Sequence, residues 1–202
     1  MDGFFLLNKE KGITSNQLVQ NIKKSLKFKK VGHLGTLDPM ATGLMVIAAN
    51  RATKFSSYFL ESDKSYHATV KLGCSTDTDD ALGKIIETSD NLPTEEHTHK
   101  VLNSFVGQSL QMAPFYSALK HKGKPLYKYA REGDFILKPP REINVFSIKD
   151  FNFDHDECSF LIHCSKGTYI RSIARDIGKK LGCGAHLSGL KRVSQGKFNI
   201  NQ

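Results

Sequence analysis

Acidic residues, cysteines and long apolar runs are all scarce in this chain of 202 residues. Asp and Glu number 20 against 29 Lys and Arg, which gives a net charge of +9 and a pI near 9.3. Such a cationic chain favours a polyanionic partner, first nucleic acid and second an acidic membrane surface. Charge alone leaves a third interpretation open, that the protein is merely basic.

The few cysteines argue against a zinc site. None of the four forms a CxxC pair, the spacing on which many structural zinc sites depend. Their scatter suits reduced thiols, so we expect a cytoplasmic protein. The sequence also lacks a nucleotide-binding motif and a metal-ligand cluster, and we therefore expect no metal and no nucleotide cofactor. The cysteines are Cys74, Cys158, Cys164 and Cys183.

The lack of long apolar runs argues against membrane insertion. No stretch approaches the roughly 20 apolar residues of a membrane span. The apolar run at residues 4–7 is too short for a signal peptide, and no basic region precedes it. A chain of 202 residues is long enough for one sizeable core. Its composition, with 39% hydrophobic and 24% charged residues, is typical of a globular protein. We expect a single domain over residues 1–202.

One stretch, VGHLGTLDPMATGL at residues 31–44, stands out by its composition. Its three glycines permit close approach of the backbone. Pro39 has a fixed backbone and pushes Asp38 toward an extended conformation. A lone carboxylate on a stiff loop beside an apolar run indicates a reactive group. The alternative is that Asp38 caps a turn or a helix, since Asp-Pro is a common turn dipeptide.

Hydrophobic periodicity predicts strands before and after this loop. Strands are expected at residues 3–7, 44–49, 66–72 and 159–164. The second is apolar throughout, as in a strand buried on both faces. The third alternates cleanly, so that Tyr66 shares one face with three apolar residues. On this pattern alone Tyr66 would be a core residue.

Helices are predicted by capping signals and by a period of 3.6 residues. Thr14 and Gln17 form a capping box that opens a helix. Its apolar face consists of Leu18, Val19, Ile22 and Leu26. The lysines that follow, between residues 23 and 30, form either a solvated face or a phosphate-binding surface. Further helices are expected near residues 52–59, 93–106 and 170–181, the last ending at Gly182.

The polar turn at residues 73–83 contains three aspartates but does not fit a calcium site. An EF-hand loop that began at Asp77 would place Thr88 at the twelfth position, where a bidentate Glu is required. His97 and His99 would point to different sides of a helix and are poor metal ligands as a pair. Asp80 is then either a turn former or a residue that orders a site.

Residues 111–141 interleave cations with aromatic side chains. The central part reads PFYSALKHKGKPLYKYAR, from Pro114 to Arg131. This composition suits a surface that grips a nucleic-acid backbone and stacks on bases. The alternative is an exposed helix and loop whose lysines lie along the surface. The candidate RNA-binding residues are Lys120, Lys122, Lys124, Tyr127 and Arg131.

The stretch Gly32–Pro39, followed by Ala41, Gly43 and Leu44, resembles the signature of the TruB family of tRNA pseudouridine synthases. The resemblance runs from Leu6 to Phe198. Other matching positions are Lys9 and Gly12, Lys64 and Tyr66, Thr76, Thr78, Asp80 and Gly83, residues 116–131, Lys166–Arg171 and Leu190–Arg192. The chain departs from the family's pattern where Asn8 and Glu10 replace Asp and Pro, and where Phe115 precedes Tyr116.

The resemblance implies roles for three catalytic residues. Asp38 would be the essential carboxylate, and Arg171 would pair with it. Tyr66 would pack against the target base and handle its proton. Without the resemblance, Arg171 could equally pair with a surface acid.

The resemblance also implies a group of substrate-binding residues. His33 would fill or stack in the space that a flipped base vacates, and Tyr169 would line the uridine pocket. The remaining members are Lys9, Asp80 and Leu190, of which Leu190 would lie near the base.

The implied reaction converts uridine to pseudouridine at position 55 in the T-arm of tRNA. The glycosidic bond breaks and the same ribose carbon joins C5 of the base, without a cofactor. The nucleotide must be flipped out of its stem-loop. Asp38 must be ionised to attack either the sugar or the base, and pairing with Arg171 would favour that form. Both points of attack remain open.

The implied fold is α/β, of the α+β type, with a mixed, largely antiparallel sheet flanked by helices and an RNA-clamping insertion at residues 111–141. We expect a monomer that binds the T-arm stem-loop and no membrane. We also expect the small C-terminal RNA-binding domain of bacterial members to be absent from this chain. The alternatives are a non-catalytic RNA-binding protein or chaperone on the same fold, and a synthase for a different RNA. Asp38, Tyr66 and Arg171 together argue against the first.

Overall fold

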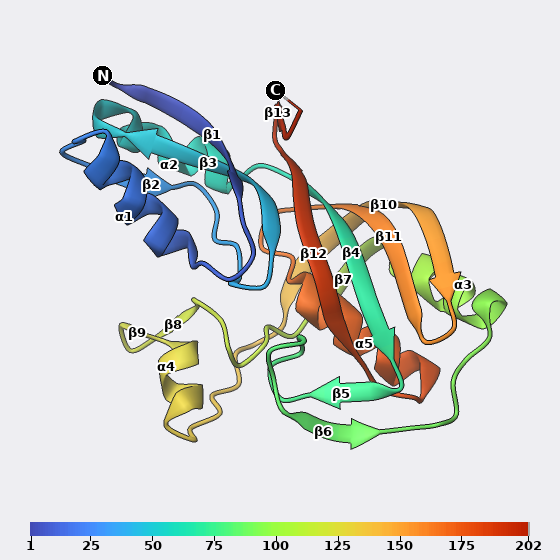
Figure 1. Cartoon of the computed structure of the whole chain (residues 1–202). Coiled ribbons are helices and arrows are strands. Elements are labelled where there is room, and N and C mark those ends of the chain that lie inside the picture. The colour runs from blue at the N-terminus through green and yellow to red at the C-terminus, as the bar shows by residue number, and fades with distance from the viewer. Residues whose placement is uncertain (202) are drawn as a thin grey trace.

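A mixed sheet runs through the computed structural model, which describes residues 1–201 (Figure 1). Its main path has the strand order β1-β3-β12-β4-β11-β10-β7, and all neighbours on this path are antiparallel except β12 and β3. The path comprises β1 Gly3–Lys9, β3 Thr42–Ala49, β12 Ala185–Gln195, β4 Lys64–Leu72, β11 Glu157–Cys164, β10 Arg141–Asp154 and β7 Gly107–Gln111. The expected mixed, largely antiparallel sheet is therefore confirmed.

Shorter elements surround this sheet. Strand β2 (Val31–His33) pairs with β3, and β13 (Phe198–Asn199) pairs with β12. Two hairpins stand apart, β5 Cys74–Thr76 with β6 Ile85–Thr88, and β8 Lys120–His121 with β9 Lys124–Pro125. The helices are α1 Ser15–Ser25, the 3₁₀ helix η1 Asn50–Phe55, α2 Ser56–Leu60, α3 Glu95–Asn103, α4 Leu126–Arg131 and α5 Ile170–Leu181.

Helix α5 covers one face of the sheet because its apolar residues recur every three or four positions. Ile173, Ala174 and Ile177 are buried against the apolar face of β4, where the predicted alternation from Tyr66 to Leu72 is confirmed. The helix ends at Gly182, whose φ of 73° gives the left-handed C-cap that glycine adopts without strain. This packing fixes the N-terminal end of α5 at one edge of the core.

Strand β3 is buried on both faces, as its continuous apolar sequence predicts. Met45 and Ile47 belong to the main core cluster. Leu44, Val46 and Ala48 belong to a second cluster, which also contains Ala52 of η1 and is flanked by Phe59 of α2 and Phe198 of β13. Asp38 therefore precedes one of the most enclosed strands of the protein.

The structure differs from the predictions at several ends of elements. The capping box of Thr14 and Gln17 is present, but α1 ends at Ser25 and Leu26 is 51% exposed, so its assignment to the apolar face is wrong. Helix α3 is shorter than residues 93–106, since it begins after Thr94, whose hydroxyl caps it, and ends at Asn103. The insertion at 111–141 begins in β7 and ends in β10, because its first and last residues pair in the sheet.

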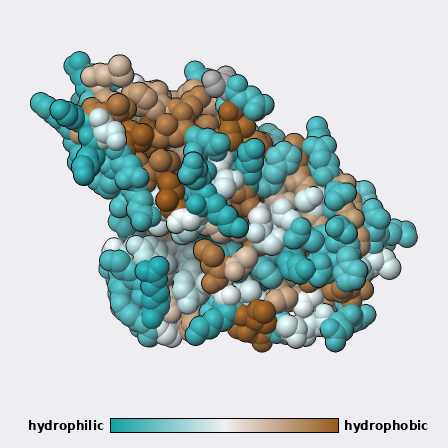
Figure 2. Space-filling view, in the orientation of Figure 1, coloured by the Kyte–Doolittle hydropathy of each residue, from teal (hydrophilic) through white to brown (hydrophobic). Residues whose placement is uncertain are grey.

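The insertion stands beside the main sheet, with β8, β9 and α4 gathered at the lower left of Figure 1. The same region is mostly hydrophilic in the space-filling view (Figure 2). Every helix within residues 1–201 is too short or too polar to cross a membrane. The same residues contain no cluster of three or more His, Cys, Asp or Glu with the arrangement of a metal site.

Candidate active site

Two side chains, those of Ser15 and Lys9, hold the backbone of the loop that carries Asp38. The Ser15 hydroxyl donates to the Leu37 carbonyl at 2.8 Å and accepts from the Leu37 amide at 2.9 Å. The ammonium of Lys9, which is fully buried, donates to the carbonyls of Ala41 at 2.7 Å and Pro39 at 3.3 Å. These contacts fix the backbone on both sides of Asp38. The Asp38 side chain remains 32% exposed.

The guanidinium of Arg171 grips this carboxylate with two donors. Its Nε donates to Asp38 Oδ2 at 2.9 Å, and its Nη2 donates to Asp38 Oδ1 at 3.3 Å. The same group also donates to the carbonyls of Thr78 at 3.0 Å and Tyr116 at 2.8 Å. The Arg171 side chain is only 5% exposed, so the cation is fixed before any ligand arrives.

Asp80 is a second carboxylate beside the Arg171 guanidinium. Its Oδ2 lies 3.7 Å from Arg171 Nε, and its Oδ1 accepts from the Thr78 hydroxyl at 2.7 Å and the Leu82 amide at 3.0 Å. The two interpretations of this residue therefore coexist, because Asp80 forms its turn and also faces the cation. The turn in addition supplies the Thr78 carbonyl that Arg171 binds.

Tyr66 lies in β4 with its ring almost completely buried, at 7% exposure. Burial raises the pKa of its hydroxyl to about 12, while the nearby Arg192 cation opposes that rise. The charge of Asp38 adds a small further increase to the Tyr66 pKa. The interpretation of Tyr66 as a core residue is confirmed.

Lys9, which the resemblance assigns to substrate binding, lies in the interior of the protein. Its side chain is fully buried, and its three carbonyl partners (Glu10, Pro39 and Ala41) use all three ammonium hydrogens. Burial lowers the pKa of Lys9, and the negative charge of Asp38 partly offsets this. The lysine therefore stabilises the loop from within the protein.

His33 and Leu190 lie near opposite ends of the Asp38 loop. His33 precedes the loop, and the Leu190 carbonyl accepts from the Thr42 hydroxyl, after the loop, at 3.4 Å. His33 is in β2, and its Nδ1 is buried without a hydrogen-bond partner among the described residues. Burial lowers the pKa of His33, with a further decrease from the Arg192 charge. Leu190 is half-buried in β12, opposite Ala68, and packs against the main core.

Tyr169 immediately precedes α5, and its backbone is held by a residue of β7. The side chain of Gln111 accepts from the Tyr169 amide at 2.8 Å and donates to the Tyr169 carbonyl at 3.1 Å. Arg141 lies over the Tyr169 ring, 5.2 Å from its centroid. The insertion and the start of α5 are thus joined directly.

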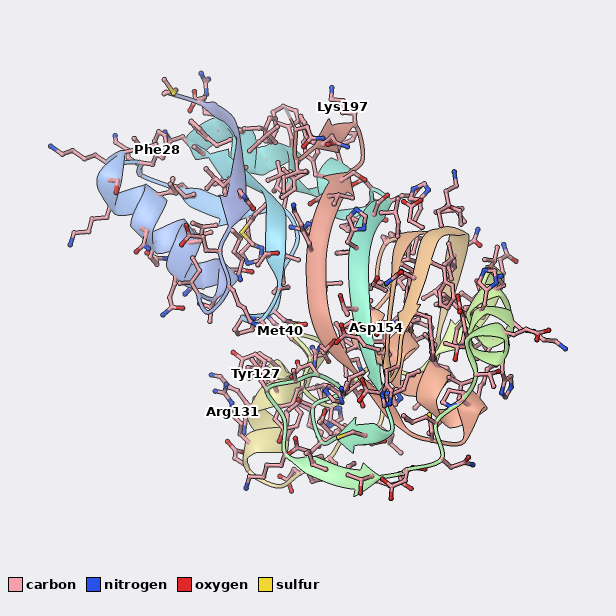
Figure 3. All side chains as sticks on the ribbon, turned by 45° about the vertical axis from the view of Figure 1, so that its right-hand side comes forward. Phe28, Met40, Tyr127, Arg131, Asp154 and Lys197 are labelled. Carbon is pink, nitrogen blue, oxygen red and sulfur yellow. The ribbon has the colours of Figure 1, made fainter. Side chains whose placement is uncertain are left out.

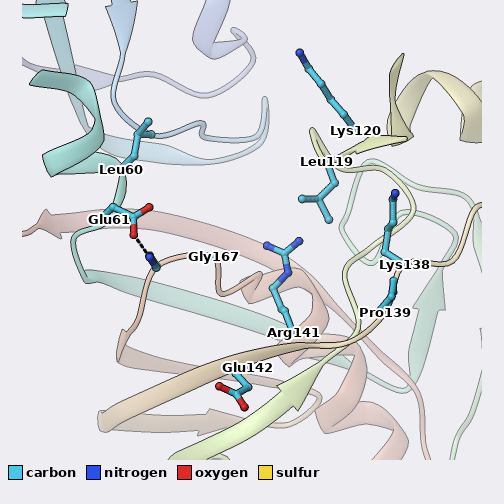
Figure 4. Close-up of a pocket in the computed structure, with 10 residues that line it drawn as sticks. Leu60, Glu61, Leu119, Lys120, Lys138, Pro139, Arg141, Glu142 and Gly167 are labelled. Atoms are coloured by element: carbon cyan, nitrogen blue, oxygen red, sulfur yellow. Dashed lines mark ion pairs between the residues drawn. The ribbon is translucent and has the colours of Figure 1, made fainter. Parts of the chain in front are cut away.

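Arg141 also lines a pocket of about 630 Å³ between the insertion and the turn before α5 (Figure 4). Lys120 and Lys138 come from the insertion, while Lys166, paired with Glu61, comes from that turn. Four cations and two acids line this hollow, which gives it a net positive charge. Its complete lining is Leu60, Glu61, Leu119, Lys120, Lys138, Pro139, Arg141, Glu142, Lys166 and Gly167.

The candidate RNA-binding cations of the insertion differ in their availability. Lys120 and Lys122 are exposed, whereas Lys124 forms an ion pair with Glu132 and lies over the Tyr129 ring. Arg131 stacks on Tyr127, with 5.4 Å between its guanidinium carbon and the ring centroid. Figure 3 shows Tyr127 and Arg131 on α4, below the loop that carries Met40. The insertion therefore adjoins the loop of Asp38.

Sequence reasoning missed three residues that build this site. Ser15 and Gln111 act on backbone groups, and no local pattern reveals such partners. Arg192 is fully buried beside Tyr66, although a lysine–arginine pair at residues 191–192 reads as a surface feature in sequence. The residues two positions away are Leu190 and Ser194, so no apolar alternation in the sequence reveals its burial.

Comparison with known proteins places the chain in a family. It matches the family model "TruB family pseudouridylate synthase (N terminal domain)" over residues 23–170, and "tRNA pseudouridylate synthase B C-terminal domain" over residues 171–202. The boundary between the two models falls inside the folded core, at the first turn of α5.

Two curated relatives are tRNA pseudouridine synthase B of Francisella philomiragia and of Methylobacillus flagellatus. The first is 49% identical over 99% of this chain and 67% of its own length, and the second is 47% identical over 99% and 66%. The chain therefore spans about two thirds of the length of these relatives.

Two solved structures share the fold. The crystal structure of a Cbf5-Nop10-Gar1 complex has a TM-score of 0.75 at 31% identity and covers 98% of this chain and 50% of that one. An H/ACA RNP bound to a substrate RNA containing 2'-deoxyuridine has a TM-score of 0.73 at 28% identity and covers 98% and 48%. The sequence match over most of the chain, the shared fold and the Asp38–Arg171 geometry agree. This chain belongs to the TruB family of pseudouridylate synthases.

Proposed function

We propose that this protein converts uridine to pseudouridine at position 55 in the T-arm of tRNA, with Asp38 as the catalytic carboxylate. The observation that carries the proposal is the two-donor grip of Arg171 on Asp38, at 2.9 and 3.3 Å. A protein that only bound RNA would have no need of a partly exposed acid held in this way. The names of the curated relatives support tRNA as the substrate.

Arg171 fixes both oxygens of Asp38 and places a positive charge beside the group that is proposed to react. Because Asp80 and the carbonyls of Thr78 and Tyr116 hold Arg171 from other sides, the cation cannot follow Asp38 when the carboxylate reacts. The electrostatic environment is therefore preorganised.

The reaction requires a balanced exchange of bonds at one nucleotide. The bond from the ribose carbon to N1 breaks, the bond from that carbon to C5 forms, C5 loses a proton and N1 gains one. The nucleotide leaves its stack to reach Asp38, and Tyr169 and Leu190 line the space around it. His33 fills or stacks in the place that the base vacates. Tyr66, adjacent to this space and buried, takes part in moving the C5 proton.

The residues proposed to bind RNA lie around one pocket and within one insertion. Recognition of a short stem-loop by shape is consistent with this compact arrangement. We therefore expect an isolated T-arm hairpin to be modified at the same uridine as intact tRNA, with only a modest loss of efficiency. Modification of tRNA but not of the hairpin would refute compact recognition.

The test uses unmodified tRNA labelled with tritium at C5 of uridine, so that release of tritium reports the reaction. Pseudouridine is then mapped by chemical modification and primer extension. The wild type should release tritium from one site, and Asp38→Asn should release none while it still binds RNA. Asp90→Asn, at an exposed acid between β6 and α3, is the matched control and should keep full activity. Comparable turnover by Asp38→Asn would disprove the assignment of the site.

A further inference from the structure

Arg192 is a completely buried cation without an acidic partner. Its side chain is fully inaccessible, and no carboxylate within residues 1–201 forms an ion pair with it. Burial of an unpaired charge is costly, so such a group is expected to interact with dipoles or with an anion that forms transiently. The position of Arg192 in the sheet indicates the group on which such an anion forms.

Arg192 stands between the strand of Asp38's loop and the strand of Tyr66. Within the sheet it is the direct partner of Gly43 on β3 and of Tyr66 on β4. Its Nε donates to the Leu44 carbonyl at 2.7 Å and its Nη2 donates to the Gly35 carbonyl at 3.1 Å. Because directly opposed residues of antiparallel strands point to the same face, the Arg192 and Tyr66 side chains are neighbours there. One cation therefore binds both ends of the Asp38 loop and lies directly across from the tyrosine.

We propose that Arg192 is a positioning residue for Tyr66, and that its buried guanidinium orients the tyrosine oxygen and stabilises negative charge on it during the reaction. This inference rests on the proposed function, because it assigns Arg192 a part in the same chemistry. Arg192 acts through Tyr66 and does not touch the nucleotide.

The way in which Arg192 acts on Tyr66 follows from the chemistry of arginine. A guanidinium can only donate, so toward Arg192 the Tyr66 oxygen can only be an acceptor. The single O–H hydrogen of Tyr66 is consequently free to face the nucleotide. When this hydrogen passes to N1, the adjacent cation stabilises the phenolate, which then takes the proton from C5. The stabilisation is large because the site excludes water.

The charge of Arg192 is felt by its other neighbours as well. It contributes to lowering the pKa of Lys64, to about 8, and the pKa of His33, although burial is the larger cause for both. An ion pair would have neutralised this field.

Gln195 provides a matched control on the same strand. It is also fully buried, and its amide donates to the Leu34 carbonyl at 2.5 Å and to the Phe59 carbonyl at 2.9 Å. Both residues thus anchor the start of the Asp38 loop from β12. Only Arg192 lies directly opposite Tyr66 in the sheet, whereas Gln195 lies opposite Lys64.

The experiment is a double-mutant cycle on the full chain. Arg192→Met and Gln195→Met are each combined with Tyr66→Phe, and the single-turnover rate of pseudouridine formation in unmodified tRNA is measured. Arg192→Met should lower the rate at least about fivefold when Tyr66 is present, but by less than about twofold in the Tyr66→Phe background. Gln195→Met should lower the rate by the same factor in both backgrounds.

Circular dichroism and tRNA binding check that each variant is folded. If Arg192→Met does not fold, Arg192→Lys takes its place, since it keeps the charge and loses the planar fork. Equal factors for the Arg192 variant in both backgrounds would overturn the inference, because they would show that Arg192 only anchors the loop. A wild type without activity on tRNA would instead refute the proposed function.

Discussion

The backbones of β3 and β12 lie close together at Gly43. We derive a quantitative prediction from this contact. Gly43 has a φ of 101°, and a Cβ atom at this residue would lie 2.8 Å from the Arg192 amide nitrogen and closer still to the Arg192 carbonyl oxygen. Backbone atoms cannot move aside as a flexible side chain does. Gly43→Ala must therefore strain its own backbone and also separate two paired strands.

The expected cost combines these two effects. A residue other than glycine in this conformation costs ~1–3 kcal/mol, and overpacking of a closed core costs a further ~1–3 kcal/mol. Gly43→Ala should thus lower the free energy of unfolding by about 2–6 kcal/mol, a large share of the roughly 5–15 kcal/mol of a typical domain. The activity should fall as well, because Arg192 and the Asp38 loop lie on either side of this contact.

Two other glycines of the chain separate the two effects. Gly12 has a φ of 92° with open space around it, so Gly12→Ala should cost only the strain, about 1–2 kcal/mol after the gain from a stiffer unfolded chain. Gly32 has neither a positive φ nor a neighbour within 4 Å, and Gly32→Ala should be close to neutral.

Urea unfolding followed by circular dichroism measures the three variants, with an unchanged slope of free energy against urea as the sign of comparable transitions. The expected order of stability is Gly32→Ala, then Gly12→Ala, then Gly43→Ala. If Gly43→Ala were as stable as Gly12→Ala, the strands would be able to move apart freely, and the argument from close approach would fail.

Three further predictions concern the site. Arg171→Ala should slow single-turnover catalysis by ~10²–10³-fold, as for removal of a preorganised donor, and Arg171→Lys should recover only part because it lacks the fork; near-normal rates in Arg171→Ala would contradict this. Joint neutralisation of the exposed Lys120, Lys122 and Lys128 should flatten the dependence of log affinity on log salt by roughly 2 units, whereas Lys124→Gln should change it little because Glu132 already pairs with that lysine. An unchanged salt slope would exclude the insertion as the clamp. The pKa of His33 is lowered in the folded state, so that below pH 6.5 the unfolded chain binds a proton that the folded chain does not, and stability should decrease as the pH falls. The free energy of unfolding of His33→Gln should decrease less on acidification, and identical pH curves would argue against the burial effect.

Local patterns were sufficient to predict part of the fold. The capping box at Thr14 and the alternation from Tyr66 to Leu72 are properties of a few neighbouring residues, and both are confirmed. Strand β12 was not predicted, because it carries two irregularities in register and buries Arg192 and Gln195 where apolar residues are expected. Leu26 was wrongly placed because periodicity continues past the point where the helix ends.

The site required more than periodicity. Asp38 and Arg171 are 133 residues apart in sequence, so no spacing rule joins them, and their pairing was expected only from the family resemblance. The contacts of Gln111 and Ser15 are made to backbone atoms, which carry no signature in sequence. Arg192 reads as a surface cation until the strand order places it between β3 and β4.

The position of β12 also has a consequence for how the chain folds. This strand, at residues 185–195, is the last long one in sequence, yet it lies in the middle of the sheet between β3 and β4. During synthesis the facing edges of β3 and β4 remain unpaired while more than a hundred further residues are added. Pairing over such separations is intrinsically slow, and open apolar strand edges are prone to association with other chains. The complete sheet thus forms only after residues 185–195 have been synthesised, so a chain that stopped before them would present two open strand edges.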